Sequence, residues 1–437
     1  MFALAYALLA SSICSLQSPA AAKDLPLRLR EAVELPSAKE RANAAIRLSK
    51  IRDVPIERWL KWMQEFGEFA QVDSGQHTFR SQLWVADRQI SRSLEVYVPS
   101  DYETTRPSPL LVLLHGSGSN GKQMLPNWKR LAEQQGYLLL APTALNSSKG
   151  YSFSQLERDT TMQALRWMRL HFNVDEDRIH LHGVSRGGHL TWDLGLRNRD
   201  HFASLIPAIG GPTWVIEEGR NNMRFMENLW DMPIRDLQGS QDDDRLLRNL
   251  RKSFERLEAA GNSNAHLKEF EDLGHSFRAD TVDWAGFIDN SVRPALPNKL
   301  LVKAAHGDNE RNSWLRIDRV TKEVREIVPL KVKASKWRAL DEAGKALHVQ
   351  DLADASTCQV IAERTADGNF NLSMRQVKQA TLMLPMEWVK GRKTISVTVE
   401  KRTQNLRIKP SAKILLLDFV ERFDRNFLPI CEVKVKP

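Results

Sequence analysis

Residues 178–189 read RIHLHGVSRGGH, an apolar run that leads directly into Gly183-Val184-Ser185-Arg186-Gly187. A helical pattern follows as far as Leu196, so the serine lies between a predicted strand and a predicted helix. This is the Gly-x-Ser-x-Gly pattern of a nucleophile elbow, in which the serine occupies a tight turn and the glycines leave room for the neighbouring strand and helix. The pattern occurs once in the chain and predicts that Ser185 is a nucleophile.

A serine is inert at neutral pH and needs an imidazole base that a carboxylate orients. In chains with this elbow, the acid and then the histidine follow the serine in sequence. His275 lies in a loop directly after the predicted strand 266–270, where a base would be presented. The other histidines lie close behind the serine, at the start of that strand, or in or near the C-terminal part: His189, His201, His266, His306 and His348. We therefore expect His275 to be the base.

The acid is expected after the predicted strand 232–237, which ends at Gln238-Gly239. Three carboxylates follow it, and Asp242 is our first choice, Asp243 the second, with Asp244 beside them. A run of aspartates also favours the start of a helix. Both roles are filled if one aspartate orients the histidine while another caps the helix.

A turn for the oxyanion is predicted at Leu114-His115-Gly116-Ser117-Gly118, because it follows the continuous apolar run 110–114 of a buried strand. An oxyanion hole of this kind takes one backbone amide from such a turn and one from the residue after the nucleophile. We expect the amide of Ser117 or Gly118, together with that of Arg186, to hold the oxyanion.

The pattern from 76 to 294 predicts an α/β fold, a mostly parallel sheet with helices on both faces. Alternating apolar residues around 83–85 and 94–98 predict antiparallel edge strands, and the apolar runs 137–141 and 178–182 predict buried strands. A helical pattern at 156–170 lies between them.

Two further parts flank this region. Residues 23–75 predict a helical segment with a docking stripe formed by Trp59, Trp62, Met63 and Phe66. After the linker at 294–297, residues 298–437 predict a basic, separate β-rich accessory domain. Its signals are a hairpin turn at Asp367-Gly368, alternation at 395–399 and a further strand at 414–420.

Residues 1–22 predict a cleaved export signal, because an uncharged apolar run to Leu16 is followed by the small residues Ala20-Ala21-Ala22. The run is too short to span a bilayer, and no other segment approaches that length, so we expect no stable membrane insertion and a secreted or periplasmic protein. Cleavage would leave Cys358 and Cys431, which either pair or remain buried thiols.

Composition and charge exclude some classes of protein. The chain has 437 residues, 42% of them hydrophobic and only 3 cysteines, which excludes a disordered or disulfide-dense protein. From Asn298 onward 27 Lys and Arg face 17 Asp and Glu, a net charge of +10, while the rest of the chain carries −1. This excess fits either a solvated basic surface or an anionic partner such as an acidic polysaccharide.

The chain resembles a known group through 177–193, through Phe202-Ala203-Ser204-Leu205-Ile206-Pro207, and through Leu114-His115-Gly116 and Gly274-His275. These residues resemble the α/β-hydrolase group of secreted predicted peptidases and esterases. That group is similar to poly(3-hydroxybutyrate) depolymerases and to feruloyl and acetyl xylan esterases. The resemblance covers about half of the chain, from 77 to 294, and implies an α/β-hydrolase fold and serine hydrolase chemistry.

The chain departs from the group at three places. The group usually has a histidine where Gln238 stands, Val-Pro where Asp243-Asp244 follow the acid, and often methionine at the position of Arg186. The amide of Arg186 would still serve the oxyanion, and its cation beside the pocket would favour anionic or acidic-sugar substrates.

These signals predict a secreted serine hydrolase that cleaves carboxylic esters of a polysaccharide-linked acyl, feruloyl or polyester type. Ester or peptide substrates, polymeric or anionic, are the expected partners. We expect no metal or cofactor, because no phosphate loop, HExxH or paired CxxC pattern occurs, and no nucleic-acid partner. Two alternatives remain: a serine peptidase that resembles the prolyl oligopeptidase group, and a non-catalytic binding protein on a hydrolase scaffold.

Overall fold

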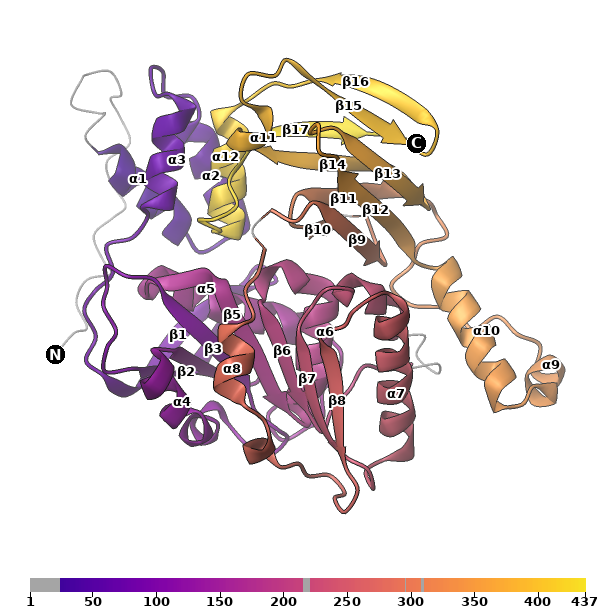
Figure 1. Ribbon diagram of the computed structural model, residues 1–437. Coiled ribbons are helices and arrows are strands. Elements are labelled where there is room, and N and C mark those ends of the chain that lie inside the picture. The colour runs from indigo at the N-terminus through magenta and orange to yellow at the C-terminus, as the bar shows by residue number, and fades with distance from the viewer. Residues whose placement is uncertain (1–23, 215–220, 295, 308–309) are drawn as a thin grey trace.

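The computed structural model describes residues 24–214, 221–294, 296–307 and 310–437 (Figure 1). The predicted export signal at 1–22 lies outside the described residues. An eight-stranded sheet runs through the first half of the chain in the order β1-β2-β4-β3-β5-β6-β7-β8. Its strands are β1 Gly75–Val85, β2 Arg88–Val98, β3 Ser108–Leu114, β4 Leu138–Pro142, β5 Val174–Val184, β6 Ser204–Ala208, β7 Ile234–Gly239 and β8 Ala265–Phe270.

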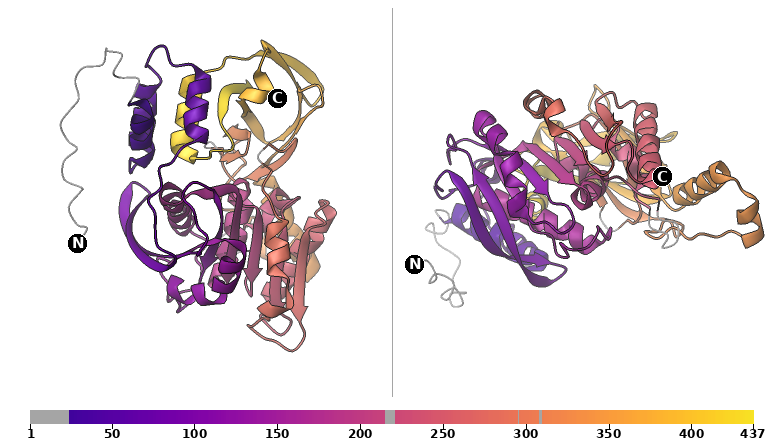
Figure 2. Two further views of the ribbon diagram at one scale, coloured as in Figure 1. Left: turned by 60° about the vertical axis from the view of Figure 1, so that its left-hand side comes forward. Right: turned by 90° about the horizontal axis from the view of Figure 1, so that it is seen from below.

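The sheet is parallel from β4 to β8, while β1 and β2 are an antiparallel hairpin at one edge. Helices cover both faces (Figures 1 and 2). One face carries α5 Gln155–His171, α6 Arg186–Asn198 and α7 Asp244–Ala259, and the other carries α4 Lys129–Gln135 and α8 Trp284–Asp289. The fold class predicted from the sequence is confirmed.

Strand β3 shows why the apolar runs are continuous. Leu110, Val112 and Leu114 face the core under α5 and α6, whereas Leu111 and Leu113 face the core under α4. All seven residues of the strand are buried, since helices exclude water from both sides of the sheet.

The C-terminal region contains two further sheets. One has the order β10-β11-β14-β17 and the other β16-β15-β13-β12-β9. The strands are β9 Lys299–Ala304, β10 Glu310–Asn312, β11 Leu315–Val320, β12 Cys358–Arg364, β13 Phe370–Arg375, β14 Val377–Pro385, β15 Thr394–Val399, β16 Arg402–Arg407 and β17 Pro429–Val435. The predicted hairpin is confirmed: β12 pairs antiparallel with β13, and Gly368 in the turn has a φ of +76°.

One part of that region differs from the prediction. Residues 414–420 belong to helix α12, Ala412–Arg422, and the prediction of a strand there was wrong. The hydroxyl of Ser411 caps the helix by accepting the amide of Lys413. Leu415, Leu416, Phe419 and Val420 are buried together, a spacing that a helix brings to one side and a strand does not.

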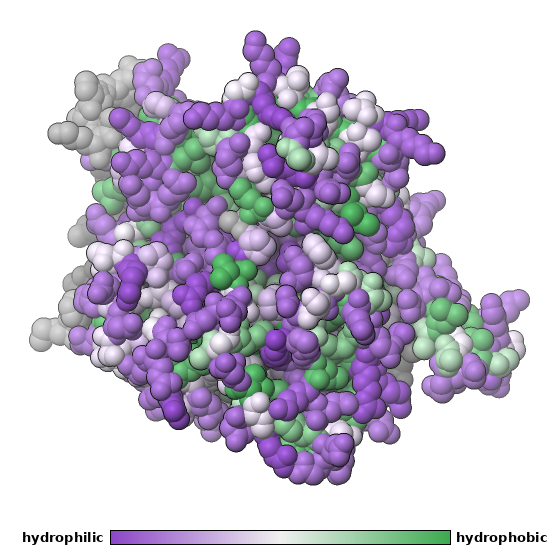
Figure 3. Space-filling model, in the orientation of Figure 1, coloured by the Kyte–Doolittle hydropathy of each residue, from purple (hydrophilic) through white to green (hydrophobic). Residues whose placement is uncertain are grey.

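Helices α9 Ala334–Ala339, α10 Glu342–Ala355 and the short α11 Met386–Val389 complete the C-terminal region. No helical signal was read there from the sequence. Helix α10, with α9 at its tip, projects from the body (Figure 1). Figure 3 shows apolar side chains exposed on this projection, and Leu347 is 60% exposed.

The N-terminal helices α1 Leu25–Glu34, α2 Ala38–Leu48 and α3 Ile56–Gln64 pack against α12. The predicted stripe faces this contact: Trp59 and Met63 are buried, and the ring of Phe66 lies 5.5 Å from that of Phe419. The first helices and the last β-rich part of the chain therefore share one hydrophobic core. The domain boundaries drawn from the sequence stay a prediction, but the C-terminal part does not pack as a separate unit.

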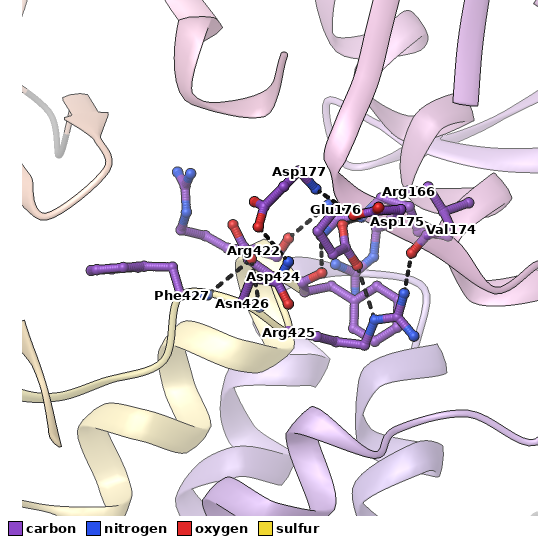
Figure 4. A network of polar contacts seen from close by, with 12 residues as sticks. Arg166, Val174, Asp175, Glu176, Asp177, Arg422, Asp424, Arg425, Asn426 and Phe427 are labelled. Atoms are coloured by element: carbon purple, nitrogen blue, oxygen red, sulfur yellow. Dashed lines mark hydrogen bonds and ion pairs between the residues drawn. The ribbon is translucent and has the colours of Figure 1, made fainter. Parts of the chain in front are cut away.

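Ion pairs join the C-terminal region to the start of β5 (Figure 4). Arg293 contacts both Asp177 and Asp424 at 2.6 Å, and the guanidinium of Arg425 lies 3.1 Å from Glu176. Ser185 lies beyond the opposite end of the same strand, about 26 Å from Asp177 at 3.3 Å per residue. The C-terminal region thus contacts the sheet at the strand ends away from Ser185.

Two observations concern the predicted absences. Among the described residues, no helix has the length and apolar character needed to cross a bilayer. Within the same residues, no group of three or more His, Cys, Asp and Glu side chains is arranged to hold a metal ion. Both remaining cysteines are buried, Cys358 in β12 and Cys431 in β17.

Candidate active site

Ser185 occupies the turn between β5 and α6 with a φ of +56°, a left-handed conformation that costs a non-glycine residue about 1–3 kcal/mol. Its amide donates to the carbonyl of Ala208 in β6 at 2.8 Å, which holds the turn. The flanking glycines are required by packing. A Cβ at Gly183 would lie 2.2 Å from the carbonyl oxygen of Gly187, and a Cβ at Gly187 would lie 2.1 Å from that of Leu114.

His275 and Asp242 lie near Ser185 at the carboxyl ends of the parallel strands. The Nε2 of His275 lies 2.8 Å from the Oγ of Ser185, and its Nδ1 lies 2.7 Å from an Oδ2 oxygen of Asp242. Asp242 follows β7 and His275 follows β8, and parallel strands bring their carboxyl ends to one edge. The contacts require Nδ1 to donate to the carboxylate, which leaves Nε2 to accept the proton of the serine.

Asp242 is held in its ionised form. Burial raises the pKa of its carboxyl, but the amide of Asp243, His275 and Gln238 all donate hydrogen bonds to it, and together they hold the pKa below its ordinary value. The side chain of Gln238 is fully buried, and its Nε2 lies 2.7 Å from the Oδ2 of Asp242. Gln238, which stood out from the sequence only as a departure from the group, therefore contacts the acid directly.

The neighbouring aspartate has the other role expected of this run. Asp243 is the N-cap of α7, and its Oδ1 accepts the amides of Arg245 and Leu246, each at 3.0 Å. Asp244 is the first residue of the helix. The structure thus brings Asp242 to His275 and turns Asp243 to the helix.

The turn after β3 lies beside the serine, since a Cβ built on Gly116 would lie 3.7 Å from the Cβ of Ser185. The amide of Gly118 is engaged, because it donates to the carbonyl of Ser147 at 2.7 Å. Within the described ranges, the amide of Ser117 has no such acceptor. Arg186 begins α6, where first-turn amides have no partner inside the helix. The amides of Ser117 and Arg186 therefore stay available beside Ser185, and this pair remains our prediction for the oxyanion donors.

His115 fixes that turn. Its Nε2 accepts the amide of Ala144 at 2.9 Å, and its Nδ1 donates to the carbonyl of Gly116 at 2.7 Å. Burial lowers the pKa of His115, so the ring stays neutral and both contacts hold. No role was read for this residue from the sequence beyond the motif that it belongs to.

The side chain of Arg186 does not act as the sequence suggested. It is 3% exposed, and its guanidinium forms an ion pair with Glu157 of α5. It offers no unpaired cation to a pocket, which removes one of the two reasons for expecting anionic substrates and leaves the basic excess of residues 298–437 as the other.

The sheet order, the strained serine after β5, the carboxylate after β7 and the histidine after β8 together define the architecture. This region has the α/β-hydrolase fold. The resemblance read from the sequence is confirmed by a relative as well. The chain is 26% identical over 174 residues to the bifunctional acetylxylan esterase/xylanase XynS20E of Neocallimastix patriciarum, a match that covers 37% of this chain and 24% of that protein. The chain thus spans about a quarter of the length of that relative.

No family model matches the chain. Solved structures similar to the hydrolase region include a thermostable esterase, with 21% identity, a TM-score of 0.38 and coverage of 49% of this chain and 60% of that one. Dipeptidyl peptidase 4 of Porphyromonas gingivalis has 19% identity, a TM-score of 0.41 and coverage of 50% and 36%. The S-formylglutathione hydrolase FrmB of Staphylococcus aureus has 17% identity, a TM-score of 0.39 and coverage of 51% and 96%.

Proposed function

We propose that the chain is a secreted serine hydrolase that cleaves carboxylic esters through Ser185, His275 and Asp242. The observation that supports this most directly is the continuous set of contacts from the serine Oγ through the imidazole to an ionised carboxylate. The same contacts argue against the non-catalytic alternative, because a binding scaffold has no need of a strained serine aligned with a base.

In the proposed reaction the Oγ of Ser185 attacks the ester carbonyl while Nε2 of His275 takes its proton. The carbonyl oxygen becomes an oxyanion, which the amides of Ser117 and Arg186 stabilise. The tetrahedral intermediate then breaks its C–O bond, and His275 returns the proton to the departing alcohol. Water, deprotonated by the same imidazole, then adds to the acyl carbon. The C–O bond to Ser185 breaks, the imidazolium returns its proton to the serine Oγ, and the carboxylic acid is released. Asp242 keeps the imidazole in the required tautomer and stabilises its charged form.

Polysaccharide-linked acyl or feruloyl esters remain the proposed substrates. The acetylxylan esterase relative supports this class, and so does the open site, in which the His275 side chain is 52% exposed. Peptide hydrolysis is the second candidate. The Oγ of Ser185 would attack the amide carbonyl in the same way, and His275 would protonate the departing nitrogen.

The test is hydrolysis of p-nitrophenyl acetate, methyl ferulate and a dipeptide anilide by the protein and by Ser185→Ala. We expect ester turnover to fall about 10⁴-fold or more in the variant, because the nucleophile is lost. Ser91→Ala, an exposed serine in β2, is the matched control and should retain activity. Ester turnover that survives Ser185→Ala would contradict the proposal, and turnover of the anilide alone would favour the peptidase.

A further inference from the structure

Arg186 makes more contacts than a residue that supplies only its backbone amide requires. Besides the ion pair with Glu157, its Nε donates to the backbone carbonyl of Lys149 at 3.1 Å. The guanidinium also lies over the ring of Tyr151, 6.0 Å from the ring centroid. The side chain is thus fixed at three points although it comes from the residue next to the nucleophile.

The carbonyl of Lys149 has a second donor. The hydroxyl of Ser117 donates to the same oxygen at 3.1 Å. One carbonyl therefore links Ser117 and Arg186, the two residues whose backbone amides are the proposed oxyanion donors. These residues lie 69 positions apart in the sequence and on different strand ends, and no other described contact joins their side chains through a single atom.

The segment that carries Lys149 is held against the oxyanion turn by two further bonds. The amide of Gly118 donates to the carbonyl of Ser147, and the amide of Ala144 donates to His115. Residues 144–149 thus contact both the turn at 115–118 and Arg186, the first residue of α6.

Glu157 makes this arrangement tolerable in a buried position. It is 5% exposed and accepts hydrogen bonds from the amide of Ser152 at 3.1 Å and from the hydroxyls of Ser152 and Ser154. A buried guanidinium is stable only when it is paired and its other groups are bonded, and Glu157 and Lys149 satisfy both conditions for Arg186.

We propose that Arg186 is a positioning residue whose side chain, through the carbonyl of Lys149, sets the spacing between the oxyanion amides of Ser117 and Arg186. The inference rests on the proposed function. An oxyanion hole depends on donors fixed within a fraction of an ångström, because only a preorganised pair stabilises the transition state more than the substrate. The guanidinium therefore acts on kcat rather than on substrate binding.

The test uses two variants that leave both amides in place. Arg186→Met keeps an unbranched side chain but removes the ion pair with Glu157 and the hydrogen bond to the carbonyl of Lys149. Ser117→Ala removes only the hydroxyl bond to that carbonyl. With p-nitrophenyl acetate, we expect kcat to fall about 10- to 100-fold in Arg186→Met and about 3- to 10-fold in Ser117→Ala, with KM within twofold. Affinity for a trifluoromethyl ketone, which forms the tetrahedral adduct, should weaken by the same factor as kcat/KM.

The control is Arg166→Met. Arg166 is also a buried arginine, but it lies in α5 at the contact with α12, away from the site. It should lower stability and leave kcat unchanged, which separates positioning from general loosening. Unchanged kcat and inhibitor affinity in Arg186→Met would overturn the inference, and so would a change confined to KM. If Arg186→Met does not fold, an unchanged kcat in Ser117→Ala overturns it. Failure of the proposed function is distinct, since it appears as absent or Ser185-independent turnover in the unmodified protein.

Discussion

At the scale of single residues, the acid run shows how neighbouring identical side chains take different roles. Asp242 accepts bonds from His275 and Gln238, whereas Asp243 accepts the first amides of α7. The sequence placed both roles within three residues. It ranked Asp242 ahead of Asp243 as the partner of the histidine but could not exclude Asp243, because the choice depends on the direction in which the loop leaves β7.

Substituting each aspartate separately tests this division of roles. Asp242→Asn should lower kcat for p-nitrophenyl acetate about 10³- to 10⁴-fold, because an amide stabilises neither the required tautomer nor the charged imidazole. Asp243→Ala should cost about 1 kcal/mol of unfolding free energy through loss of the N-cap, with kcat within threefold. Steady-state kinetics and urea unfolding measure both effects. The reverse pattern would make Asp243 the acid.

At the scale of elements, the end of α12 is stabilised from outside the helix. Arg166 of α5 donates to the carbonyls of Val420 and Glu421, each at 2.9 Å, and to that of Val33 in α1 at 2.7 Å. A cation near a helix C-terminus satisfies its last carbonyls and complements the helix dipole. One arginine thus joins helix α5 to α1 and to α12.

Arg166→Met tests this joint. We expect the free energy of unfolding to fall by about 2–4 kcal/mol, since three buried carbonyls lose a charged donor. Urea unfolding followed by circular dichroism measures the loss, and Arg47→Met, an exposed arginine on α2, is the control. A loss below about 0.5 kcal/mol would show that the joint contributes little to stability.

At the scale of the whole molecule, part of the basic excess of the last third serves the packing of the chain. Arg311, Arg422 and Arg425 are largely buried and paired with Asp418, Asp200 and Glu176. These residues are not available to an external anion. An anionic partner for the remaining exposed lysines and arginines stays a prediction.

Three histidines, of which His180 and His182 are buried and His201 is partly buried, make the stability of the molecule depend on pH. Burial lowers the pKa of His180 and His201 to about 3 and that of His182 to about 4. These rings are neutral in the folded state and bind a proton on unfolding once the pH falls below about 6.5. Stability is therefore complete above that pH and is lost as the pH falls toward the folded pKa values. Each histidine contributes about 1.4 kcal/mol between pH 7.5 and 5.5.

Urea unfolding at pH 7.5 and 5.5 checks this, and the three histidines together should lower the unfolding free energy by about 4 kcal/mol. His182→Asn should reduce the difference by about a third. A stability that is equal at the two pH values would contradict the assignment of neutral buried rings.

The sequence alone determined the parts of this protein that depend on neighbouring residues. The strained turn at Ser185 needs Gly183 and Gly187, and β3 needs an unbroken apolar run, so both are visible in the printed residues. The tertiary structure decided three matters: that Asp242 rather than Asp243 contacts His275, that Glu157 pairs with Arg186, and that α12 packs on the N-terminal helices. Each depends on groups that are distant in sequence and brought together by packing, and no local pattern encodes such a contact.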